Sequence, residues 1–385
     1  MNKLKVGVVY GSRSTEHDIS VVTAIASIIK PLELSGKYEV VPIYIDKQGF
    51  WYSDPKLKDI ALFSSGEIDN WLKHNRPVQL GIGDGLSLIK PGIAKKPLKI
   101  DVVFPATHGT HGEDGELMGL LEMANVAYVG CNMPSSALAM DKALAKIVAQ
   151  ESGIASTKYV WFYARDFSDN AAKVLNSLAH LRYPLFVKPV HLGSSIAITR
   201  VKSEAELKNA IEVAAHYDNK VIVEEEVQNL IEATVPIMGN DKLMPALVEQ
   251  PVTHGDDFFD FETKYMAGGK KGKGGKTNGS QGYSRLPADL PKDLMVKAEQ
   301  TALGVYKALG CSGIARIDLL VDTKANQVYF NEVNPLPGSL YAHNWRAAGK
   351  SNVELVDELV KLALDKYAQQ QKLSTVFATN YLKQY

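Results

Sequence analysis

The clearest alternation of apolar and polar positions lies in residues 314–338, which are predicted to form two strands joined by a turn. Both runs are rich in Ile, Leu, Val, Tyr and Phe, the side chains that favour strands. Between them, residues 322–326 read Asp-Thr-Lys-Ala-Asn, which supplies turn chemistry. The pattern therefore predicts a hairpin whose successive side chains point to opposite faces of a sheet.

Polar side chains gather on one face of this hairpin. Arg316 and Asp318 share a face of the first strand, and Glu332 and Asn334 share a face of the second. Pairing the strands would bring together three oxygen-bearing side chains with no Cys or His, a set that suits Mg²⁺. Arg316 beside them would be a fixed cation for a phosphate or oxyanion. An ordinary solvated face is the alternative, but a carboxylate flanked by apolar residues is costly to bury unless it is paired or metal-bound.

Continuous apolar runs open the chain. Residues 4–10, 38–45 and 100–105 predict buried parallel strands, with a helix over residues 19–29 between the first two. This α/β beginning lacks the G-x-G-x-x-G of a dinucleotide site, which disfavours a dehydrogenase. Glu16 follows the first strand, and two interpretations of it are equally supported: a residue complementing the helix dipole, or a ligand-binding carboxylate at the sheet edge.

A glycine-rich loop follows the strand at residues 100–105. It carries His108, His111, Glu113 and Asp114, which raises a zinc hypothesis. Three glycines in so short a loop favour backbone held close to a ligand instead, and an ordinary glycine-rich turn is the third interpretation. A helix over residues 116–125 is predicted next.

Two further stretches carry lysines. A single helix is predicted over residues 134–152, with Asp141 and Lys142 inside it, where Lys142 on its own would be a solvated lysine. A strand over residues 184–189 contains Lys188 and leads into a Gly-Ser-Ser turn. A lysine beside such a turn is suited to grip a phosphate, although the P-loop spacing is missing.

The other predicted elements carry no clear chemistry. Residues 51–96 are expected to form short strands and turns. Three consecutive acids, 224–226, are typical of a solvated edge, and two of the three are assigned to one. The chain is expected to fray from about residue 369. The remaining strands are predicted at 196–201, 220–223, 231–237 and 243–248, and the remaining helices at 204–215, 292–309 and 353–367.

Glycine and lysine alternate within residues 266–282, a composition unlike the rest of the chain. A flexible linker is one interpretation. A long loop inside a domain is more typical of a lid, and its lysines indicate a lid that meets phosphate.

Composition narrows the class of protein. A chain of 385 residues is expected to form two or three domains, and 45% hydrophobic with 22% charged residues is typical of a soluble globular protein. The formal net charge of +0 offers no overall field for nucleic acid or an anionic membrane. Cys131 and Cys311 fit neither a disulfide framework nor a zinc spacing, which favours a reducing cytosol. Neither a signal peptide nor a membrane span is predicted.

In combination, these motifs resemble the D-alanine–D-alanine ligases of the ATP-grasp superfamily over roughly residues 5–364. The resemblance implies a mixed α/β protein of three domains and a tail. The motifs are residues 14–20, 108–109 with 112–115, 140–142, 187–189 with 193–195, 262–265, and 316–318 with 332–334. The implied domains are a Rossmann-like N-terminal α/β domain, 1–131, a central ATP-grasp domain, 132–224, a C-terminal ATP-grasp domain, 225–370, and a tail, 371–385.

The resemblance also implies the site. Two Mg²⁺ ions, which Mn²⁺ could replace, would bind Asp318, Glu332 and Asn334. For ATP, it implies phosphate contacts from Lys142 and Lys188, adenine contacts from Glu224 and the backbone near Val227, a ribose contact from Glu232, and a further contact from Lys264. For the amino acids, it implies that Glu16 receives the first ammonium, that Ser194 and Tyr265 link the first carboxylate to the lid, that Arg316 and the Gly338 amide face the oxyanion, and that His108, Ser339 and His343 line the substrate pocket.

The activity so implied joins two D-alanines through an acyl phosphate for peptidoglycan synthesis, in a cytoplasmic homodimer that binds neither nucleic acid nor membrane. After Gly338 the family commonly carries small hydroxyl residues that bind the second carboxylate, whereas this chain carries His343 there. The second substrate is therefore open among D-alanine, D-serine, D-lactate and another amine. An inactive nucleotide-binding sensor is a further alternative, which the intact Asp318, Glu332 and Lys188 weigh against.

Overall fold

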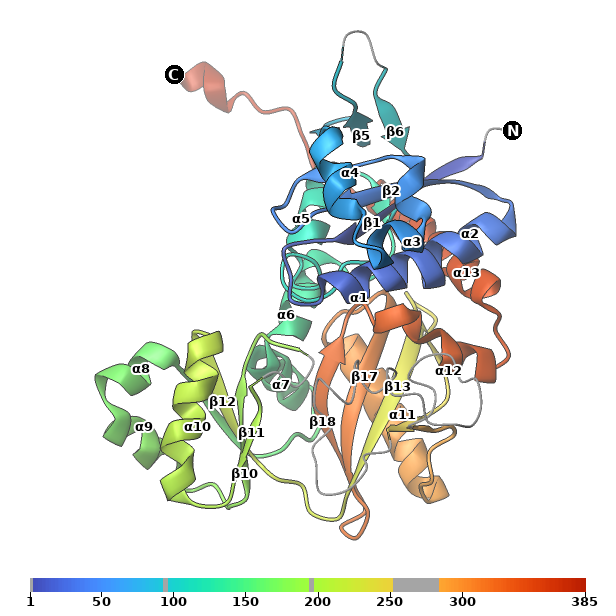
Figure 1. Cartoon of the computed structure of the whole chain (residues 1–385). Helices are drawn as coiled ribbons and strands as arrows, with labels where there is room; N and C mark the ends of the chain where they lie inside the picture. Colours follow the sequence, from blue (N-terminus) through green and yellow to red (C-terminus); the bar gives the residue numbers. More distant parts are fainter. Residues whose placement is uncertain (1–2, 93–95, 194–196, 252–283) are drawn as a thin grey trace.

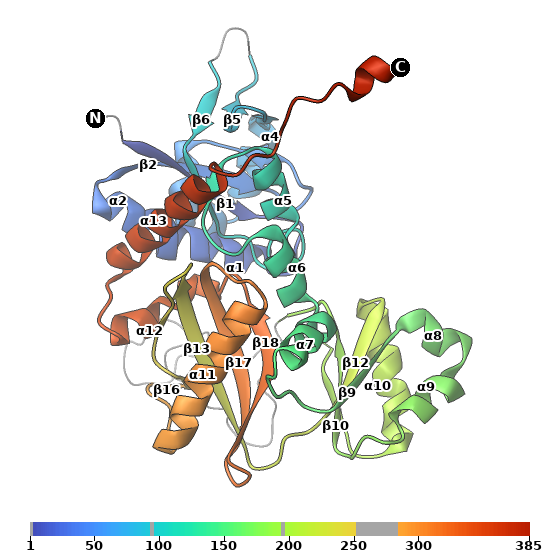
Figure 2. The ribbon, with the colours of Figure 1, turned by 180° about the vertical axis from the view of Figure 1, so that it is seen from behind.

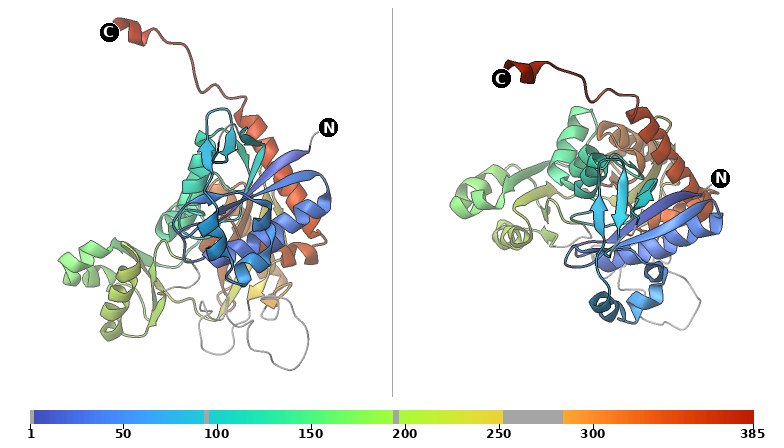
Figure 3. Two further views of the ribbon diagram at one scale, coloured as in Figure 1. Left: turned by 45° about the horizontal axis from the view of Figure 1, so that its top comes forward. Right: turned by 90° about the horizontal axis from the view of Figure 1, so that it is seen from above.

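The computed structural model describes residues 3–92, 96–193, 197–251 and 284–385. Three sheets form three lobes around a common centre (Figure 1). The first sheet lies at the top of that view, the second at the lower left and the third at the lower right. Seen from other directions, the second sheet and its helices project to one side of the other two (Figure 3). The predicted α/β class is confirmed.

The first sheet has the order β3-β2-β1-β7-β8, with β1 parallel to both neighbours. Buried Val and Ile side chains fill the middle of its strands, as expected for a parallel sheet covered on both faces. Its strands are β1 (Leu4–Gly11), β2 (Tyr38–Ile45), β3 (Trp51–Tyr52), β7 (Val102–Pro105) and β8 (Ala127–Tyr128).

One helical run follows β1, longer than the helix predicted from residue 19. It begins as α1 (His17–Val22), passes through a π-helical stretch (Thr23–Ile29) and ends as α2 (Lys30–Ser35). The run ends at Gly36, which has φ of 68° and so caps the helix in the left-handed conformation. A widened π turn next to a sheet edge is often found at functional sites.

The buried strand predicted over residues 100–105 is confirmed as β7 from Val102 onward, but it is shorter than predicted, because Ile100 ends β6 in another sheet. Asp101 makes the break: its Oδ2 accepts a hydrogen bond from the backbone N–H of Lys5 at 2.7 Å. The segment before it belongs to a small antiparallel sheet, β4 (Gln79–Gly81), β5 (Leu86–Ile89) and β6 (Leu98–Ile100).

The segment predicted as only strands and turns also contains helices, and the first two of them begin where Asp54 and Asp59 cap them. These helices are a 3₁₀ turn (Pro55–Lys58), α3 (Ile60–Ser64) and α4 (Ile68–His74).

The second sheet is fully antiparallel, in the order β11-β10-β12-β9. Its helices pack an apolar stripe onto one face, leaving the other face to the centre of the molecule. The strands are β9 (Tyr159–Tyr163), β10 (Leu185–Pro189), β11 (Thr199–Val201) and β12 (Lys220–Glu225), and the helices are α8 (Ala164–Asp169), α9 (Ala171–Leu178) and α10 (Glu204–Tyr217).

The third sheet contains the predicted hairpin. β17 (Gly313–Asp322) and β18 (Gln327–Asn334) pair antiparallel across the predicted turn, with β13 (Leu230–Gly239) on the other side of β17. Helix α11 (Lys292–Ala308) crosses the sheet and buries its apolar stripe there, as Figure 2 shows from behind. Of the strand predicted at 243–248, only β14 (Met244–Pro245) forms, and β15 (Gln250–Pro251) pairs with β16 (Ser284–Arg285) nearby.

The single helix predicted over residues 134–152 is wrong. It is two helices, α6 (Met133–Met140) and α7 (Lys142–Glu151), separated at Asp141. Asp141 is extended, with φ of −91° and ψ of 99°, and its Oδ1 accepts the N–H of Leu144 at 2.8 Å. It therefore ends one helix and caps the next, which places Lys142 at a helix start rather than on a solvated face.

The last helices return to the beginning of the chain. After a 3₁₀ turn (Gly338–Tyr341) and α12 (Ala342–Ala347), the long α13 (Asn352–Gln370) packs on the first sheet and on α2. Figure 2 shows α13 lying across that lobe. The chain then extends away from the body as far as a short 3₁₀ turn (Tyr381–Gln384). No helix in the described part of the chain is long and apolar enough to cross a bilayer.

Candidate active site

Two adjoining cavities lie where the three lobes meet. The lysine cavity lies between the second and third sheets, and the Glu16 cavity lies between the first and third sheets. The residues that line both are Lys142, Gly193, Arg316, Glu332 and Tyr341. The predicted residues that line only the lysine cavity are Lys188, Glu224, Val227, Glu232 and Asp318. Those that line only the Glu16 cavity are Glu16, His108, Asn334, Gly338, Ser339 and His343.

The predicted convergence of polar side chains on the hairpin is confirmed. The sheet register places Asp318 opposite Glu332 and Arg316 opposite Asn334. Asn334 Nδ2 donates a hydrogen bond to Asp318 Oδ2 at 3.0 Å. Cross-strand neighbours on one face are therefore what bring these oxygens together.

Each carboxylate of this group faces a fixed cation. Arg316 donates from Nε and Nη2 to the two oxygens of Asp318, at 2.9 and 2.6 Å, and Lys142 Nζ lies 3.3 Å from Glu332 Oε2. Burial would lower the pKa of Arg316, but Asp318 more than offsets it and the pKa is raised. The site thus offers clustered oxygen ligands, with a positive charge beside each carboxylate, to a magnesium phosphate.

Lys142 is anchored at the junction of the cavities. Its Nζ donates to the Leu192 carbonyl at 2.7 Å, and its side chain is 9% exposed. The helix break at Asp141 supplies this position, because it makes Lys142 the first residue of α7. From there Lys142 points toward residues 190–193, the segment after β10 that we call the strap. The sequence could not show this, since the break depends on the fold.

A buried ion cluster lies behind the lysine cavity. Glu224 Oε2 lies 3.2 Å from Lys146 Nζ, Glu224 Oε1 lies 3.4 Å from Lys188 Nζ, and Thr157 donates to Oε2 at 2.8 Å. Burial alone would raise the pKa of Glu224, but the two lysines outweigh it and the pKa falls to about 2. Lys188 and Glu224, predicted on separate grounds, are therefore direct partners.

The prediction that two of the three acids at 224–226 lie on a solvated edge is wrong, because Glu224 and Glu225 are both buried. Glu224 is buried within the cluster, and Glu225 is buried beside Arg182, whose Nη2 donates to it at 3.0 Å. Glu224 Oε1 forms no hydrogen bond with any described residue, although it is buried and lines the cavity. An acceptor oriented in this way fits a hydrogen-bond donor of a nucleotide base.

The Glu16 cavity holds a second carboxylate pair. Glu16 is 8% exposed, and a Cβ on Gly109 would lie 2.9 Å from its Oε2, so only glycine fits there with φ of 70°. Beneath it, Glu113 Oε2 accepts the N–H of Gly109 at 2.8 Å and Glu113 Oε1 lies 3.8 Å from His108 Nδ1. Burial would lower the pKa of His108, but Glu113 and Glu16 raise it overall. The cavity is thus anionic near Glu16, which suits an ammonium group.

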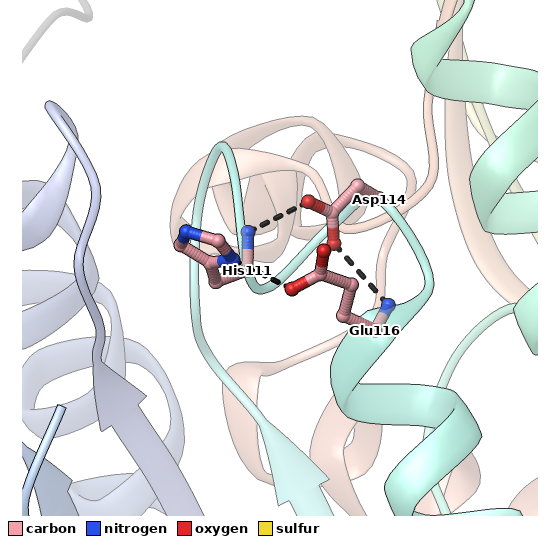
Figure 4. Close-up of side chains that lie close together, drawn as sticks. All are labelled: His111, Asp114 and Glu116. Atoms are coloured by element: carbon pink, nitrogen blue, oxygen red, sulfur yellow. Dashed lines mark hydrogen bonds and ion pairs between the residues drawn. The ribbon is translucent and has the colours of Figure 1, made fainter.

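The side chains of His108 and His111 have different partners, which argues against a zinc ion bound by both. His108 points inward, with Nε2 3.0 Å from Thr23 Oγ1. His111 lies on the outer side with Asp114 and Glu116 (Figure 4), and their ligand atoms lie within 4.8 Å of one another. In that outer cluster His111 and Asp114 are half-buried and Glu116 is exposed, and the cluster lies at the positive end of α5 (Glu116–Met123), an unfavourable place for a cation.

A left-handed turn closes the Glu16 cavity. Ser339, Leu340 and Tyr341 have φ of 50°, 54° and 52°, a run that costs roughly 1–2 kcal/mol per residue. Ser339 N–H donates to Thr23 Oγ1 at 3.1 Å, which ties the turn to the π-helical stretch. A Cβ on Gly338 would meet nothing within 4 Å, so a larger residue there would project into the cavity.

His343 is not a solvent-facing residue at a helix start. Its Nε2 lies 2.8 Å from Glu249 Oε2, and Asn344 Nδ2 donates to the same oxygen at 3.0 Å. The rings of His343 and Tyr341 are in contact, with centroids 4.6 Å apart and planes tilted by 54°. Burial would raise the pKa of Glu249, but His343 outweighs it and the pKa is lowered.

Other predicted features lie outside the described residues. They are Ser194, Lys264, Tyr265 and the lid over residues 266–282.

Several contacts were missed by sequence reasoning. Thr234 donates to Asp318 Oδ1 at 3.0 Å from the neighbouring strand, and Lys146 is fully buried inside an amphipathic helix. Glu249 lies far along the chain from its partner His343. Only the polar interruption of the apolar strand at Thr234 gave a signal, because the other contacts depend on tertiary packing.

Comparisons with known proteins agree with this arrangement. Two family models match, the one described as D-ala D-ala ligase N-terminus over residues 5–131 and the one described as D-ala D-ala ligase C-terminus over residues 148–361. A D-alanine–D-alanine ligase of Thermoanaerobacter sp. (strain X514) is 36% identical over 95% of this chain and 98% of its own length. Another, of Chlorobium phaeovibrioides, is 37% identical over 95% and 98%.

Solved structures are similar as well. The D-alanine–D-alanine ligase of Coxiella burnetii superposes with a TM-score of 0.78 at 31% identity, covering 97% of both chains. The VanG D-Ala:D-Ser ligase of Enterococcus faecalis gives 0.75 at 31% identity, covering 94% of this chain and all of its own. The fold and the cleft define an ATP-grasp protein. Within that class, the chain belongs to the D-alanine–D-alanine ligase family.

Proposed function

We propose that the protein joins two D-alanine molecules, at the cost of ATP, into D-alanyl-D-alanine for peptidoglycan synthesis. The observation that carries the proposal is the set of Arg316, Asp318, Glu332 and Asn334 at the junction of the two cavities. A carboxylate bound in the Glu16 cavity would there meet a phosphate bound in the lysine cavity. Membership in the family implies an ATP-dependent reaction on small molecules.

The nucleotide half of the site is proposed as follows. Lys142 and Lys188 bind phosphate oxygens, Glu224 and the backbone near Val227 face adenine, and Glu232 binds the ribose. The buried Glu224 Oε1, which makes no hydrogen bond to a described residue, supports the adenine assignment. Lysines held by carboxylates need little reorganisation when phosphate arrives, which favours electrostatic stabilisation.

The amino-acid half is proposed to act in two steps. Glu16 binds the ammonium of the first D-alanine, whose carboxylate oxygen attacks the γ-phosphorus of ATP and displaces ADP. The amine of the second D-alanine then attacks the acyl carbon, and phosphate leaves from the tetrahedral oxyanion. We assign Arg316 and the Gly338 amide to stabilise that oxyanion, and His108, Ser339 and His343 to shape the pocket; all five line the Glu16 cavity, which supports the assignment.

Asp318, Glu332 and Asn334 would hold the metal, which we propose to be two Mg²⁺ ions. The oxygen-only set fits this assignment, and bound Mg²⁺ would neutralise the charge of the transferring phosphoryl group. Ser194, Lys264 and Tyr265 are proposed to complete the site.

The proposal also includes three domains, with boundaries near residues 131, 224 and 370. It further includes a homodimeric assembly and a cytoplasmic location. The described residues in the apolar core of the second sheet all belong to the proposed central domain, which supports that domain, whereas α13 of the proposed C-terminal domain shares its core with the first sheet.

The proposal is tested by phosphate release from ATP with D-alanine, L-alanine, D-serine and D-lactate, and by chromatography of the product. Dipeptide and stoichiometric phosphate with D-alanine are expected, with L-alanine inactive. Preferred release with another acceptor would assign the enzyme a different second substrate. A lack of ATP turnover with every pair would refute the ligase assignment.

A further inference from the structure

A second charged cluster lies beside the lysine cavity and takes no part in the proposed chemistry. It consists of Asp141, His191, Asp218 and Lys220, drawn from the break between α6 and α7, the strap after β10, the end of α10 and the start of β12. The two carboxylates and the lysine are 6–8% exposed and His191 is 39% exposed. Each buried charge carries a desolvation cost, so a cluster of this kind needs close ion pairs to offset it.

His191 is held by carboxylates on both sides of its ring. Nδ1 lies 3.0 Å from Asp218 Oδ1, and Nε2 lies 3.3 Å from Asp141 Oδ2. Its backbone N–H also donates to Asp218 Oδ2 at 2.7 Å. Both ring nitrogens are donors only in the imidazolium form, so this geometry selects the protonated ring.

The cluster continues into the framework of the second lobe. Lys220 Nζ lies 2.7 Å from Asp141 Oδ2 and 4.3 Å from the centroid of the Trp161 ring. Asp141 also caps α7, which begins at Lys142. Asp141 therefore contacts both the start of α7, which carries the proposed phosphate-binding Lys142, and the ring of His191.

Residues on either side of His191 are bonded to Lys142. The Lys142 N–H donates to the Val190 carbonyl at 3.4 Å, and Lys142 Nζ donates to the Leu192 carbonyl at 2.7 Å. Next in the strap is Gly193, which lines both cavities. Movement of His191 would therefore move the groups that face nucleotide and first substrate.

We propose that His191 is a positioning residue for nucleotide binding: its imidazolium, held between Asp141 and Asp218, fixes the strap against the start of α7. Lys142 and Gly193 are thereby aligned with the phosphates, an inference that rests on the proposed function. Loss of the ring proton leaves two facing carboxylates with one bridging cation fewer, and the strap loosens.

The charges around the ring set the pH at which this occurs. Asp141 and Asp218 face it from two elements, and Lys220 is the cation that opposes them. Hydrogen bonds to Asp141 and then Asp218 raise the pKa of His191 from 6.5 to about 9, against the effect of burial. The positioning effect is therefore complete at neutral pH and is lost as the pH rises through about 9.

The test measures binding of the non-hydrolysable analogue AMP-PNP with Mg²⁺ by calorimetry between pH 7 and pH 10. No acceptor amine is present, so its titration does not enter. We expect the parent to bind well at pH 7 and to weaken above pH 9. His191→Asn should bind roughly tenfold more weakly at pH 7 and show a flat profile, since one charge-assisted contact is removed.

Two further variants separate positioning from folding. His191→Arg retains a cation at every pH and should restore binding and remove the alkaline loss. Asp218→Asn keeps one acceptor and removes a charge, so it should move the loss to lower pH. His180→Asn, an exposed histidine of the same lobe, is the matched control and should match the parent.

The outcomes are distinct. If His191→Asn binds AMP-PNP as the parent does, with the parental pH profile, His191 does not position nucleotide. A lowered melting temperature with unchanged affinity would show a structural role only and overturn the inference. If His191→Asn does not fold, an unshifted profile in Asp218→Asn overturns it instead. Absence of binding by the parent would refute the proposed function, not this inference alone.

Discussion

The two halves of the cleft are built differently. In the lysine cavity, charged side chains project from regular elements and are already paired, as in Lys188 with Glu224 and Arg316 with Asp318. The charged side chains that line only the Glu16 cavity come from loops and helix ends, near the left-handed turn at 339–341, while Arg316 and Glu332 of the third sheet line both cavities. The comparison teaches that the half proposed to bind the nucleotide rests on rigid sheets, whereas the half proposed to select the amino acids rests largely on connecting segments, which tolerate sequence change.

The largest expected effect comes from the paired half. Glu332→Gln removes the charge that faces Lys142 and one proposed metal ligand, so turnover should fall by roughly 10³-fold while the fold persists. Phosphate release and circular dichroism measure the two. Glu299→Gln, an exposed acid on α11, is the control. Near-parental turnover in Glu332→Gln would remove the metal assignment.

Next comes the buried cluster behind the lysine cavity. Lys146→Met leaves Glu224 with fewer partners and should lower the free energy of unfolding by about 3 kcal/mol. The depressed pKa of Glu224 means that its stabilisation is complete above pH 4.5 and is lost as the pH falls toward about 2. Urea unfolding at pH 7 and pH 3 measures both. Lys173→Met, on an exposed face of α9, should change little, and equal stability of Lys146→Met would show that the cluster is dispensable.

In the loop-built half, Glu16→Ala should weaken the first D-alanine by about 2 kcal/mol, roughly thirtyfold in KM, because the ammonium loses its buried partner. The KM for ATP should stay near the parental value. Steady-state kinetics with each substrate varied in turn makes the distinction, and Asp18→Ala, an exposed neighbour, is the control. An unchanged KM for D-alanine would mean that another group receives the ammonium.

The smallest effect is expected at His343. His343→Ser breaks the pair with Glu249 and the ring contact with Tyr341, so affinity for the second substrate should change about fivefold, with the first substrate unaffected. Competition between D-alanine, D-serine and D-lactate over pH 6–9 reads this out. Identical profiles for variant and parent would leave His343 a purely structural residue of α12.

Sequence periodicity predicted the hairpin and its polar face, but it did not predict the site residues that lie in loops. Alternation alone placed Arg316, Asp318, Glu332 and Asn334 together, because strand geometry is fixed. The roles of Glu16 and His343 needed the family resemblance, since no period relates residues so far apart. The break at Asp141 was missed. Lys220, an ion-pair partner of Asp141 there, lies 79 residues away in the sequence. Local pattern predicts elements; it does not predict which tertiary contact interrupts them.

The return of α13 to the first sheet has a consequence for synthesis of the chain. Leu355, Val356 and Leu359 share one apolar core with Ile28 and Leu32 near the beginning. During translation, which folds domains from the N-terminus, that face of the first lobe stays uncovered until the last helix leaves the ribosome. A nascent chain of the first lobe would expose an aggregation-prone surface for most of its synthesis, so chaperones that shield apolar patches should matter more for this lobe than for the second.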